Sequence, residues 1–542
     1  MNLPEDPSTL HRLWATSCLA VLALGTLWIG FDGRLYWHDV RFLYACSQLS
    51  MDDVLAGVFN PHQAWSQIDE LGSGGFYASK VLHLWLLHAV YAFLAPEQGG
   101  LELSIALSAS LVLGAVTVSY FFFSQVSGSR QFAILAASCV AAAPVTPYLL
   151  GKLLSESTSF FLTTLSLLVI VRSHKSTSLA WPALAGVLLA LAALARLDSI
   201  LGVMGFLLAG VLVNVFPAER RVLIRQAGIT VAAGALIYIG MLQLLGVSPP
   251  ALTTYLNEFI NAPRKSLLMS ALGMVTFAGA LYIPATVALA KRPDRLTYFF
   301  LVWLLVTWIP ILVMTSNYMV EPRYLVQGLL PFAGLAAVGI RILGNRLRTD
   351  HVRAGVAAIA LLLTLGVNRA AVALMPYELD RHAILRAVAQ IVDLGGPEAY
   401  ILVPWAYTDF HFLAVMRPDL NVLNINFPRQ RPDEPTLQIW VNRFKDWYGD
   451  RYLYDPNRLQ RLIDRHDIYY LGWRRYPPLE NVATFASMIS ETLAQAIRRI
   501  AVTDRLTESW VWAERGVEHR EIGRVGQYEY YRIRARGPEN PS

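Results

Sequence analysis

The feature that most constrains this chain is a succession of apolar runs, about 18–24 residues each, through its first two-thirds. A helix needs roughly 20 residues to cross the hydrocarbon core of a bilayer. Lipid cannot satisfy free backbone polar groups, so a helix is the expected spanning form. Only 15% of the residues are charged, against about 25% in an average soluble domain. The sequence predicts a mainly α-helical, polytopic membrane protein with about eleven transmembrane helices.

The first run, residues 13–31, lacks a small-x-small cleavage site and is followed by further spans, so we interpret it as an uncleaved first span. A long loop, residues 32–101, comes next. It begins with many acidic residues and then holds a hydrophobic stretch, residues 76–94. The other predicted spans are residues 102–124, 131–149, 155–171, 180–194, 198–216, 226–246, 268–290, 297–314, 324–340 and 354–375.

The charges of the loops give these spans a direction. If residues 76–94 do not cross, one set of loops carries thirteen Lys and Arg residues and the opposite set carries five. The positive-inside rule places the richer set, and with it the N-terminus, in the cytoplasm. The stretch 76–94 then lies along the outer interface or re-enters the membrane. The net charge of +6 is accounted for by these loops and does not indicate nucleic acid.

The apolar pattern stops near Pro376. Residues 376–542 are predicted to form a soluble, extracytoplasmic α/β domain, with residues 1–375 as the membrane domain. Residues 381–394 have helical spacing and are followed by Gly395 and Gly396. Short β-rich runs cover residues 400–403, 421–425, 468–471, 510–513 and 528–533.

Charged side chains gather at the span ends that this topology places on the outer face. An ionisable group at membrane depth is a functional candidate, because burying it is costly. For any single pair, a salt bridge that caps a helix end is the alternative. Several such places on one face, together with the acidic first loop, predict an active site that opens outward. The residues are Lys152, Glu156, Arg196, Asp198, Asn257, Glu258, Glu321, Arg323 and Tyr324.

Several short motifs follow one another in a fixed order. The long loop contains Trp-His-Asp-Val-Arg-Phe at 37–42 and Lys-Val-Leu-His-Leu-Trp at 80–85. Later come Ser-Glu at 155–156, Ala-Arg-Leu-Asp at 195–198 and Glu-Pro-Arg-Tyr-Leu at 321–325, with Pro331 beyond. This order resembles the GT-C glycosyltransferases, in particular the branch of protein O-mannosyltransferases and bacterial lipid A aminoarabinose transferases.

The first two motifs keep part of the pattern of that branch. Its acidic pair, in a sequence like Asp-Glu-x-Arg-Tyr, is matched by Asp39 and Arg41, with His38 in place of the first acid. Its Lys-Pro-Pro-Leu-x-Tyr-Trp segment is matched by Lys80 and Trp85, without the prolines. The resemblance covers residues 10–375, and its weight lies in the order and common side of the motifs.

The resemblance implies transfer of a sugar from a polyprenyl-phosphate-linked donor to a lipid, glycan or protein acceptor at the outer face. A single inverting displacement needs a base for the acceptor and cations for the leaving phosphate, which parallels inverting glycosidases. Asp39 is the candidate base. A solvated loop carboxylate or a helix N-cap is the alternative reading of Asp39.

The remaining candidates would bind substrate. Arg41, Lys80, Arg196 and Arg323 are candidate phosphate ligands, with snorkelling or a topological role as the alternative. The others would bind the sugar or hold these cations in place, and for the acids a structural role weighs more. They are Glu156, Asp198, Glu321 and Tyr324.

No metal ligand set is predicted. The histidines of the first loop include His83 and His88, whose spacing does not place both on one helix face, although some GT-C relatives use a divalent cation. Two other functions stay open. One is a transporter or flippase of lipid-linked glycans, although the sequence has no evident inverted repeat. The other is a non-catalytic assembly protein. The expected location is the inner membrane of a bacterium, where membrane lipids surround the spans.

Overall fold

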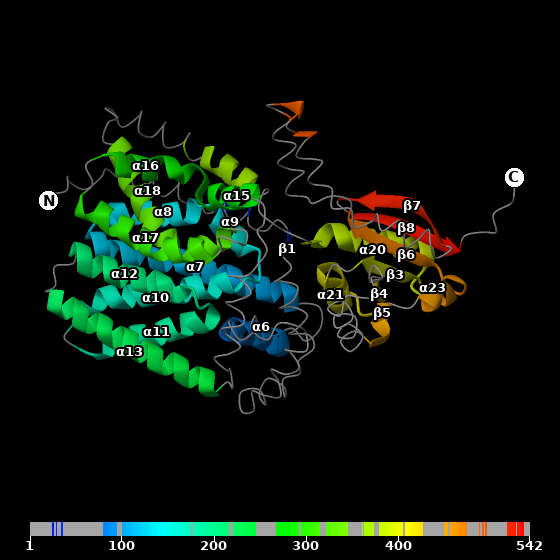
Figure 1. The fold of residues 1–542 in the computed structure, drawn as a ribbon, viewed down its shortest axis with the longest axis horizontal. Helices are drawn as coiled ribbons and strands as arrows, with labels where there is room; N and C mark the ends of the chain where they lie inside the picture. The colour runs from blue at the N-terminus through cyan, green and yellow to red at the C-terminus, as the bar shows by residue number, and fades with distance from the viewer. Residues whose placement is uncertain are drawn as a thin grey trace.

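In a computed structural model, the chain is described over residues 80–94, 100–174, 178–215, 220–244, 267–291, 294–314, 321–344, 363–372, 379–404, 407–425, 449–453, 456–473, 517–526 and 528–535, with isolated residues such as 34–35 besides. Two regions are visible along its longest axis, a bundle of helices and a sheet with its own helices (Figure 1). Asp39, Arg41, Asn257, Glu258 and the predicted strand at 510–513 lie outside the described residues.

The helices of the bundle follow the apolar runs. The predicted and observed bounds agree within a few residues for the described spans, because long apolar runs specify the helix interior and polar residues mark its ends. The helices are α7 (Gly100–Ser127), α8 (Arg130–Ala142), α9 (Val145–Leu150), α10 (Ser155–Ser173), α11 (Ala180–Ala195), α12 (Ser199–Val213), α13 (Arg220–Leu244), α15 (Leu267–Ala278), α16 (Tyr282–Ala290), α17 (Arg295–Met314) and α18 (Leu329–Gly344).

Two predicted spans are each broken into two helices. The span 131–149 divides at Ala143 and Pro144 into α8 and α9. The span 268–290 divides at the short 3-10 turn η1 (Gly279–Leu281), where Gly279 has a φ of +52°. Only glycine adopts this left-handed conformation readily, and a helix does not continue through it. Five segments of the described chain are long and apolar enough to cross a membrane: 100–127, 220–244, 273–290, 295–313 and 322–343.

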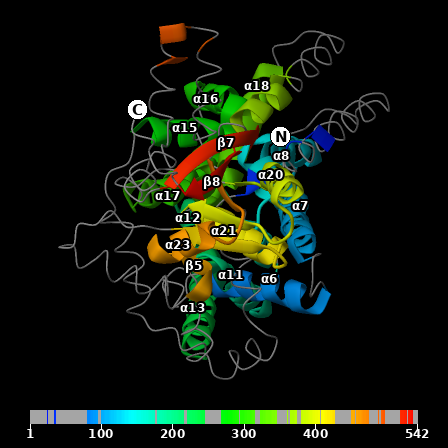
Figure 2. The same cartoon turned by 90° about the vertical axis from the view of Figure 1, so that its right-hand side faces the viewer.

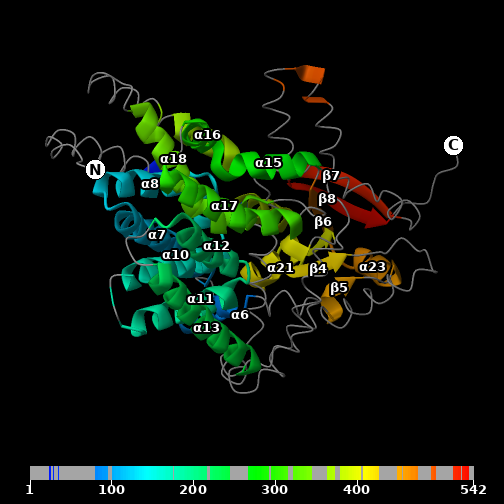
Figure 3. The same cartoon turned by 60° about the vertical axis from the view of Figure 1, so that its left-hand side comes forward.

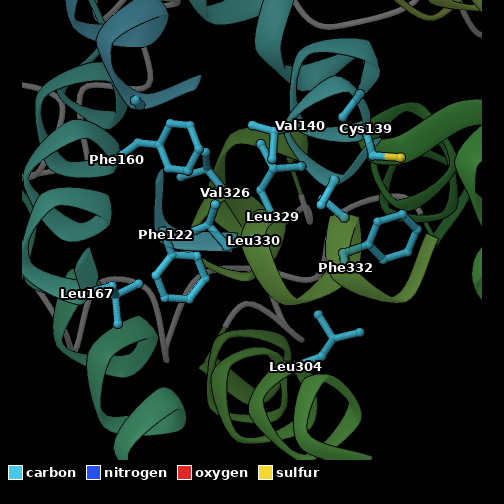
Figure 4. Packing of buried hydrophobic residues seen from close by; sticks show 14 of the residues in the cluster. Phe122, Cys139, Val140, Phe160, Leu167, Leu304, Val326, Leu329, Leu330 and Phe332 are labelled. Carbon is cyan, nitrogen blue, oxygen red and sulfur yellow. The ribbon is translucent and has the colours of Figure 1, made fainter. Parts of the chain in front are cut away.

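The core of the bundle is a single large apolar cluster. Phe122 of α7, Phe206 of α12 and Trp303 of α17 meet edge to face, with ring centroids 5.2–5.7 Å apart. Figure 4 shows side chains of this cluster from α8, α10 and α18 that pack together with Phe122 and Leu330. Close backbone contact also contributes, because a Cβ atom at Gly339 of α18 would collide with the carbonyl oxygen of Pro284 in α16.

Helix α6 (Val81–Leu94) lies within the hydrophobic stretch 76–94. Its 14 residues are fewer than the roughly 20 that a crossing helix needs. It packs against α7, α10 and α11, and its residues Val81, Leu84 and Leu87 are buried. The helix is therefore enclosed by protein along several faces.

Residues 379–535 contribute a mixed sheet with strand order β5-β4-β3-β6-β8-β7 (Figure 1), and Figure 2 shows β7 and β8 toward one edge of it and β5 toward the other. The first four strands are parallel, β8 is antiparallel to its neighbour β6, and the edge strand β7 is antiparallel to β8. The strands are β3 (Tyr400–Pro404), β4 (Asn421–Ile425), β5 (Tyr452–Leu453), β6 (Ile468–Trp473), β7 (Val517–Val525) and β8 (Tyr528–Ala535), and the helices are α20 (Arg381–Gly395), α21 (Tyr407–Met416) and α23 (Pro456–Ile463).

Helix α20 shows why these residues fold as they do. The Asp380 side chain accepts hydrogen bonds from the backbone N–H groups of His382 and Ala383, at 3.0 and 2.9 Å, and so caps the helix. The C-cap Gly396 has φ +76° and ψ 175°, a backbone region that essentially only glycine adopts without strain. Ile384, Ala387, Val388 and Ile391 form its buried face.

The sheet and the bundle share an apolar cluster. Leu84 of α6, Leu101 of α7 and Ile384 of α20 belong to it, together with the sheet face that carries Ile401 and Tyr469. Figure 3 shows α21 between the bundle and the sheet. At the same junction Arg381 pairs with Glu102 of α7 at 2.5 Å, and β1 (Arg34–Leu35) pairs antiparallel with β2 (Leu379–Asp380).

Candidate active site

Three breaks in the bundle bring the predicted charged residues together. Glu156 is the second residue of α10. Arg196 ends α11 with an extended backbone, φ −162° and ψ 127°, and Asp198 precedes α12. Glu321 precedes the 3-10 segment η2 (Pro322–Gly328), which holds Arg323 and Tyr324. Charged residues are thus carried by helix ends, where the chain turns, and the apolar helix interiors remain uninterrupted.

Glu156 is the hub of this group, which we call the charged cluster: Lys80, Glu156, Arg196, Asp198, Glu321, Arg323 and Tyr324. Its Oε1 accepts a hydrogen bond from Nη1 of Arg196 at 2.6 Å and lies 3.7 Å from Nη1 of Arg323. The Glu156 side chain is 1% exposed. A buried carboxylate is costly unless cations and hydrogen bonds compensate it, and the two guanidinium groups provide that compensation.

Each arginine also has a carboxylate of its own. Nε and Nη2 of Arg196 donate to the two oxygens of Asp198 at 2.8–3.2 Å, the paired geometry that suits a planar guanidinium. Nε of Arg323 donates to Glu321 Oε2 at 2.5 Å. The ring of Tyr324 lies beneath both, with its centroid 5.9 Å from Cζ of Arg196 and 5.0 Å from Cζ of Arg323.

Lys80 joins the cluster from another part of the chain. It immediately precedes α6 and is 4% exposed. Burial lowers the pKa of the Lys80 ammonium well below its ordinary value of 10.5, and the nearby charge of Arg196 lowers this pKa further. The charge of Glu156 raises the same pKa but does not offset those effects. Lys80 therefore releases its proton more readily than a surface lysine.

A layer of uncharged polar groups supports the cluster from the bundle side. Gln327 of η2 donates from Nε2 to Ser159 Oγ at 2.9 Å and to Ser199 Oγ at 3.4 Å. Ser159 follows Glu156 on α10, and Ser199 follows Asp198 at the start of α12. These bonds tie together the three chain segments that carry the charges.

The cluster is accessible from one side. The side chains of Arg196 and Asp198 are 12% and 19% exposed, whereas those of Glu156, Glu321 and Arg323 are 1–3% exposed. A ligand would first meet the Arg196–Asp198 edge. The three cations and three carboxylates of the cluster balance in formal charge.

Two further buried residues of the described chain bear on this site. Lys152 is buried near the ring of Tyr148, with Nζ 5.5 Å from its centroid. His83 is not among the residues that the sequence predicts for the site, because its spacing from His88 was weighed only for metal binding. The structure places His83 against the first turn of α10, with hydrogen bonds on both ring nitrogens. The signal in the sequence that could have indicated His83 is a polar residue within an apolar stretch, three positions after Lys80 and so one helical turn away. In the part of the chain that the structure describes, no three His, Cys, Asp or Glu side chains group as metal ligands.

Comparison with solved structures shows which known proteins share this fold. No family model matches the chain, and no curated protein matches its sequence. Among solved structures it is similar to ArnT from Cupriavidus metallidurans, a GT-C superfamily member. The match to the apo state has a TM-score of 0.53 at 14% identity and covers 98% of this chain and 100% of that chain.

A second crystal structure of ArnT, bound to undecaprenyl phosphate, matches with a TM-score of 0.52 at 12% identity and covers 95% of this chain and 97% of that chain. The oligosaccharyltransferase of Archaeoglobus fulgidus matches with a TM-score of 0.49 at 14% identity, over 86% and 70% of the two chains. The ArnT matches show that this chain has the GT-C fold that its motifs predict.

Proposed function

We propose that this chain is a membrane glycosyltransferase that transfers a sugar from a polyprenyl-phosphate-linked donor to a lipid, glycan or protein acceptor. Two observations support the proposal. The chain shares its fold over nearly its full length with ArnT, which has been crystallised with undecaprenyl phosphate. The strongest support comes from the charged cluster. It includes Lys80, Arg196 and Arg323 beside Glu156, and so offers buried cations to an anionic headgroup.

The proposed reaction is a single inverting displacement. A nucleophile of the acceptor attacks the anomeric carbon, the bond from that carbon to the phosphate oxygen breaks, and its electron pair leaves with the polyprenyl phosphate. Asp39 is proposed to take the proton of the nucleophile. Cations near the leaving phosphate stabilise the charge that develops there, which is the largest catalytic contribution in many enzymes. Lys80, Arg196 and Arg323 are proposed for this role, joined by Arg41.

The acidic residues have a supporting role in this proposal. Glu156, Asp198 and Glu321 hold the guanidinium groups in place, and the Arg196–Asp198 edge is where a donor phosphate would enter. Tyr324 supplies a ring under both arginines. When a phosphate exchanges with a carboxylate on one arginine, the remaining carboxylate contacts keep that arginine oriented.

The proposed topology has eleven spans in a bacterial inner membrane, with a cytoplasmic N-terminus. Residues 376–542 then form an extracytoplasmic domain on the same side as the charged cluster. The ion pair of Arg381 with Glu102, at the start of α7, supports a common side, because Leu101 at that helix start shares an apolar cluster with Leu153, three residues before Glu156.

A transfer assay with a labelled polyprenyl-phosphate sugar tests the function. Release of polyprenyl phosphate with loss of labelled donor supports the transferase. Movement of donor across a vesicle membrane without bond cleavage identifies a transporter, and neither outcome favours an assembly protein. Asp39→Asn should abolish release while the protein level and the thermal unfolding midpoint stay unchanged. An Asp39→Asn variant with normal turnover would exclude Asp39 as the base.

A further inference from the structure

His83 lies on α6, one helical turn after Lys80, and is 1% exposed. Its Nε2 is 2.7 Å from the carbonyl oxygen of Leu153, and its Nδ1 is 2.9 Å from Oγ1 of Thr158. The carbonyl only accepts hydrogen bonds, so Nε2 carries a proton. In the neutral ring Nδ1 is then an acceptor, and the Thr158 hydroxyl donates to it.

The two bonds straddle Glu156. Leu153 lies three residues before Glu156, and Thr158 lies two residues after it. The imidazole therefore spans the start of α10 at the point where the hub carboxylate emerges. Residues three apart on a helix share a face, so the Lys80 and His83 side chains leave α6 toward the same neighbours. The charges of Arg196 and Glu156 act on Lys80 accordingly.

Apolar contacts also hold α6. Leu84 and Leu87 pack in the cluster shared with the sheet, and Val81 packs against Leu194 of α11. Apolar contact is non-directional, so these contacts keep the helix in place but tolerate small rotations and shifts. Hydrogen bonds weaken steeply with misalignment. The two bonds of His83 are therefore suited to fix the rotation of α6.

We infer that His83 is a positioning residue, whose hydrogen bonds to Leu153 and Thr158 fix α6 on the first turn of α10 and so set where the Lys80 amino group lies relative to Glu156, Arg196 and Arg323. The inference rests on the proposed function for its kinetic consequence. Its geometric content, the placement of Lys80, does not depend on that function.

The first test is kinetic. His83→Leu should raise the donor KM about tenfold or more, since tenfold corresponds to the loss of a hydrogen bond of ordinary net strength, with a smaller change in kcat. Thr158→Val, which removes only the partner hydroxyl, should shift KM in the same direction by less. His88→Leu is the matched control, because His88 is an equally buried histidine of α6 five residues further on and hence on a different face. It should leave KM unchanged.

A double-mutant cycle separates positioning from general packing. In a Lys80→Met background, His83→Leu should have no further effect on donor KM, because the residue through which it acts is gone. A general loss of packing would add to the Lys80→Met effect instead. Additive effects, or a KM increase in His88→Leu equal to that in His83→Leu, would overturn the inference.

A second readout needs no activity. Lys80 is 4% exposed, so it should react slowly with an amine-acylating reagent in the intact protein. Mass spectrometry should show faster acylation of Lys80 in His83→Leu and in Thr158→Val, with no change in His88→Leu. Equal Lys80 acylation in wild type and His83→Leu contradicts the positioning role. If wild type releases no polyprenyl phosphate but the acylation rates differ as stated, the proposed function fails and the positioning role stands.

Discussion

At the scale of single residues, the one buried carboxylate of Glu156 compensates the positive charges of two arginines. Glu156→Gln keeps the shape of the side chain but leaves Arg196 and Arg323 with less negative charge around them. Removing one partner of a buried ion pair typically costs about 3–5 kcal/mol. We expect Glu156→Gln to lower the thermal unfolding midpoint of the purified protein clearly and to raise the donor KM.

Asp198→Asn is the matched comparison for Glu156→Gln. Asp198 pairs with one of the same arginines, but its side chain is 19% exposed, so water compensates part of its loss. Its unfolding midpoint should fall by less than that of Glu156→Gln. An equal or larger fall would show that Glu156 is not the hub of the cluster.

The lowered pKa of Lys80 predicts a pH dependence. In the proposed reaction the charged Lys80 ammonium binds the donor phosphate, and this charge is lost as the pH rises through the Lys80 pKa. Because that pKa lies well below 10.5, kcat/KM for the donor should begin to fall at a pH where an ordinary lysine is still charged. The dependence of kcat/KM on pH reports the free enzyme, and a steady-state series in overlapping buffers measures it.

Lys80→Arg should abolish this fall, because a guanidinium stays charged throughout the accessible range. Lys152→Arg, a change at a second buried lysine, beside the ring of Tyr148, should leave the fall in place. A wild-type profile that is flat up to the ordinary lysine range would contradict the assignment of Lys80.

The residues of the charged cluster were predictable from sequence, and their contacts were not. A charged residue at the end of an apolar run can be recognised in the sequence itself, which is why Glu156, Arg196 and Arg323 were identified. The pairing of Arg196 with Glu156 joins two helices and depends on how they pack, which the runs do not encode. His83 was missed because a histidine in an apolar stretch has the same pattern whether it fills space or bonds to a neighbour.

At the scale of elements, close helix packing depends on particular glycines. A Cβ atom at Gly339 would collide with the Pro284 carbonyl oxygen, which belongs to backbone and cannot rotate away. Gly339→Ala should therefore separate α16 from α18 and destabilise the protein by about 1–3 kcal/mol or more. A lower unfolding midpoint in detergent checks this expectation.

Gly240 of α13 offers the control, because an added Cβ there meets no atom within 4 Å. Gly240→Ala should leave the unfolding midpoint unchanged or raise it slightly, since alanine favours helix. If both variants behave alike, close packing at Gly339 does not limit stability.

Helix positions followed from the apolar runs, whereas helix breaks did not. Apolar periodicity extends through residues 131–149 and 268–290 alike, and a proline or a glycine in such a run often stays within the helix. Pro310, for example, lies inside α17, while Pro144 and Gly279 coincide with breaks. Neighbouring helices decide which of these outcomes occurs.

At the scale of the whole molecule, the sheet supports the helix that carries His83. Ile384 of α20 and Leu84 of α6 belong to one apolar cluster. Ile384→Ala should cost about 2–5 kcal/mol and, because the same cluster holds α6, also raise the donor KM. Thermal unfolding and steady-state kinetics on one preparation measure both effects.

Leu459 of α23 provides a matched control. It is buried on the opposite face of the sheet, in a cluster that contains no residue of α6 or α7 among those described. Leu459→Ala should lower the unfolding midpoint by a similar amount and leave the donor KM unchanged. A KM increase in both variants would mean that loss of stability alone weakens donor binding.

The strand order of the sheet was beyond prediction from the sequence. The strands at 400–403 and 421–425 were identified from their β-branched and aromatic residues, but β7 is a mostly polar edge strand, with exposed residues along most of its length, and shows no such pattern. The contact of the sheet with α6 also joins segments that are hundreds of residues apart, and nothing local marks it.

The pairing of β1 with β2 has a consequence for biosynthesis. Arg34 and Asp380 are neighbours in the sheet register, yet they leave the ribosome about 350 residues apart. At translation rates of roughly 5–20 residues per second, the early strand waits about 20–70 s for its partner, while the intervening helices are inserted. Cotranslational assembly therefore closes this junction late, and the newborn chain passes most of its synthesis with these two strands still unpaired.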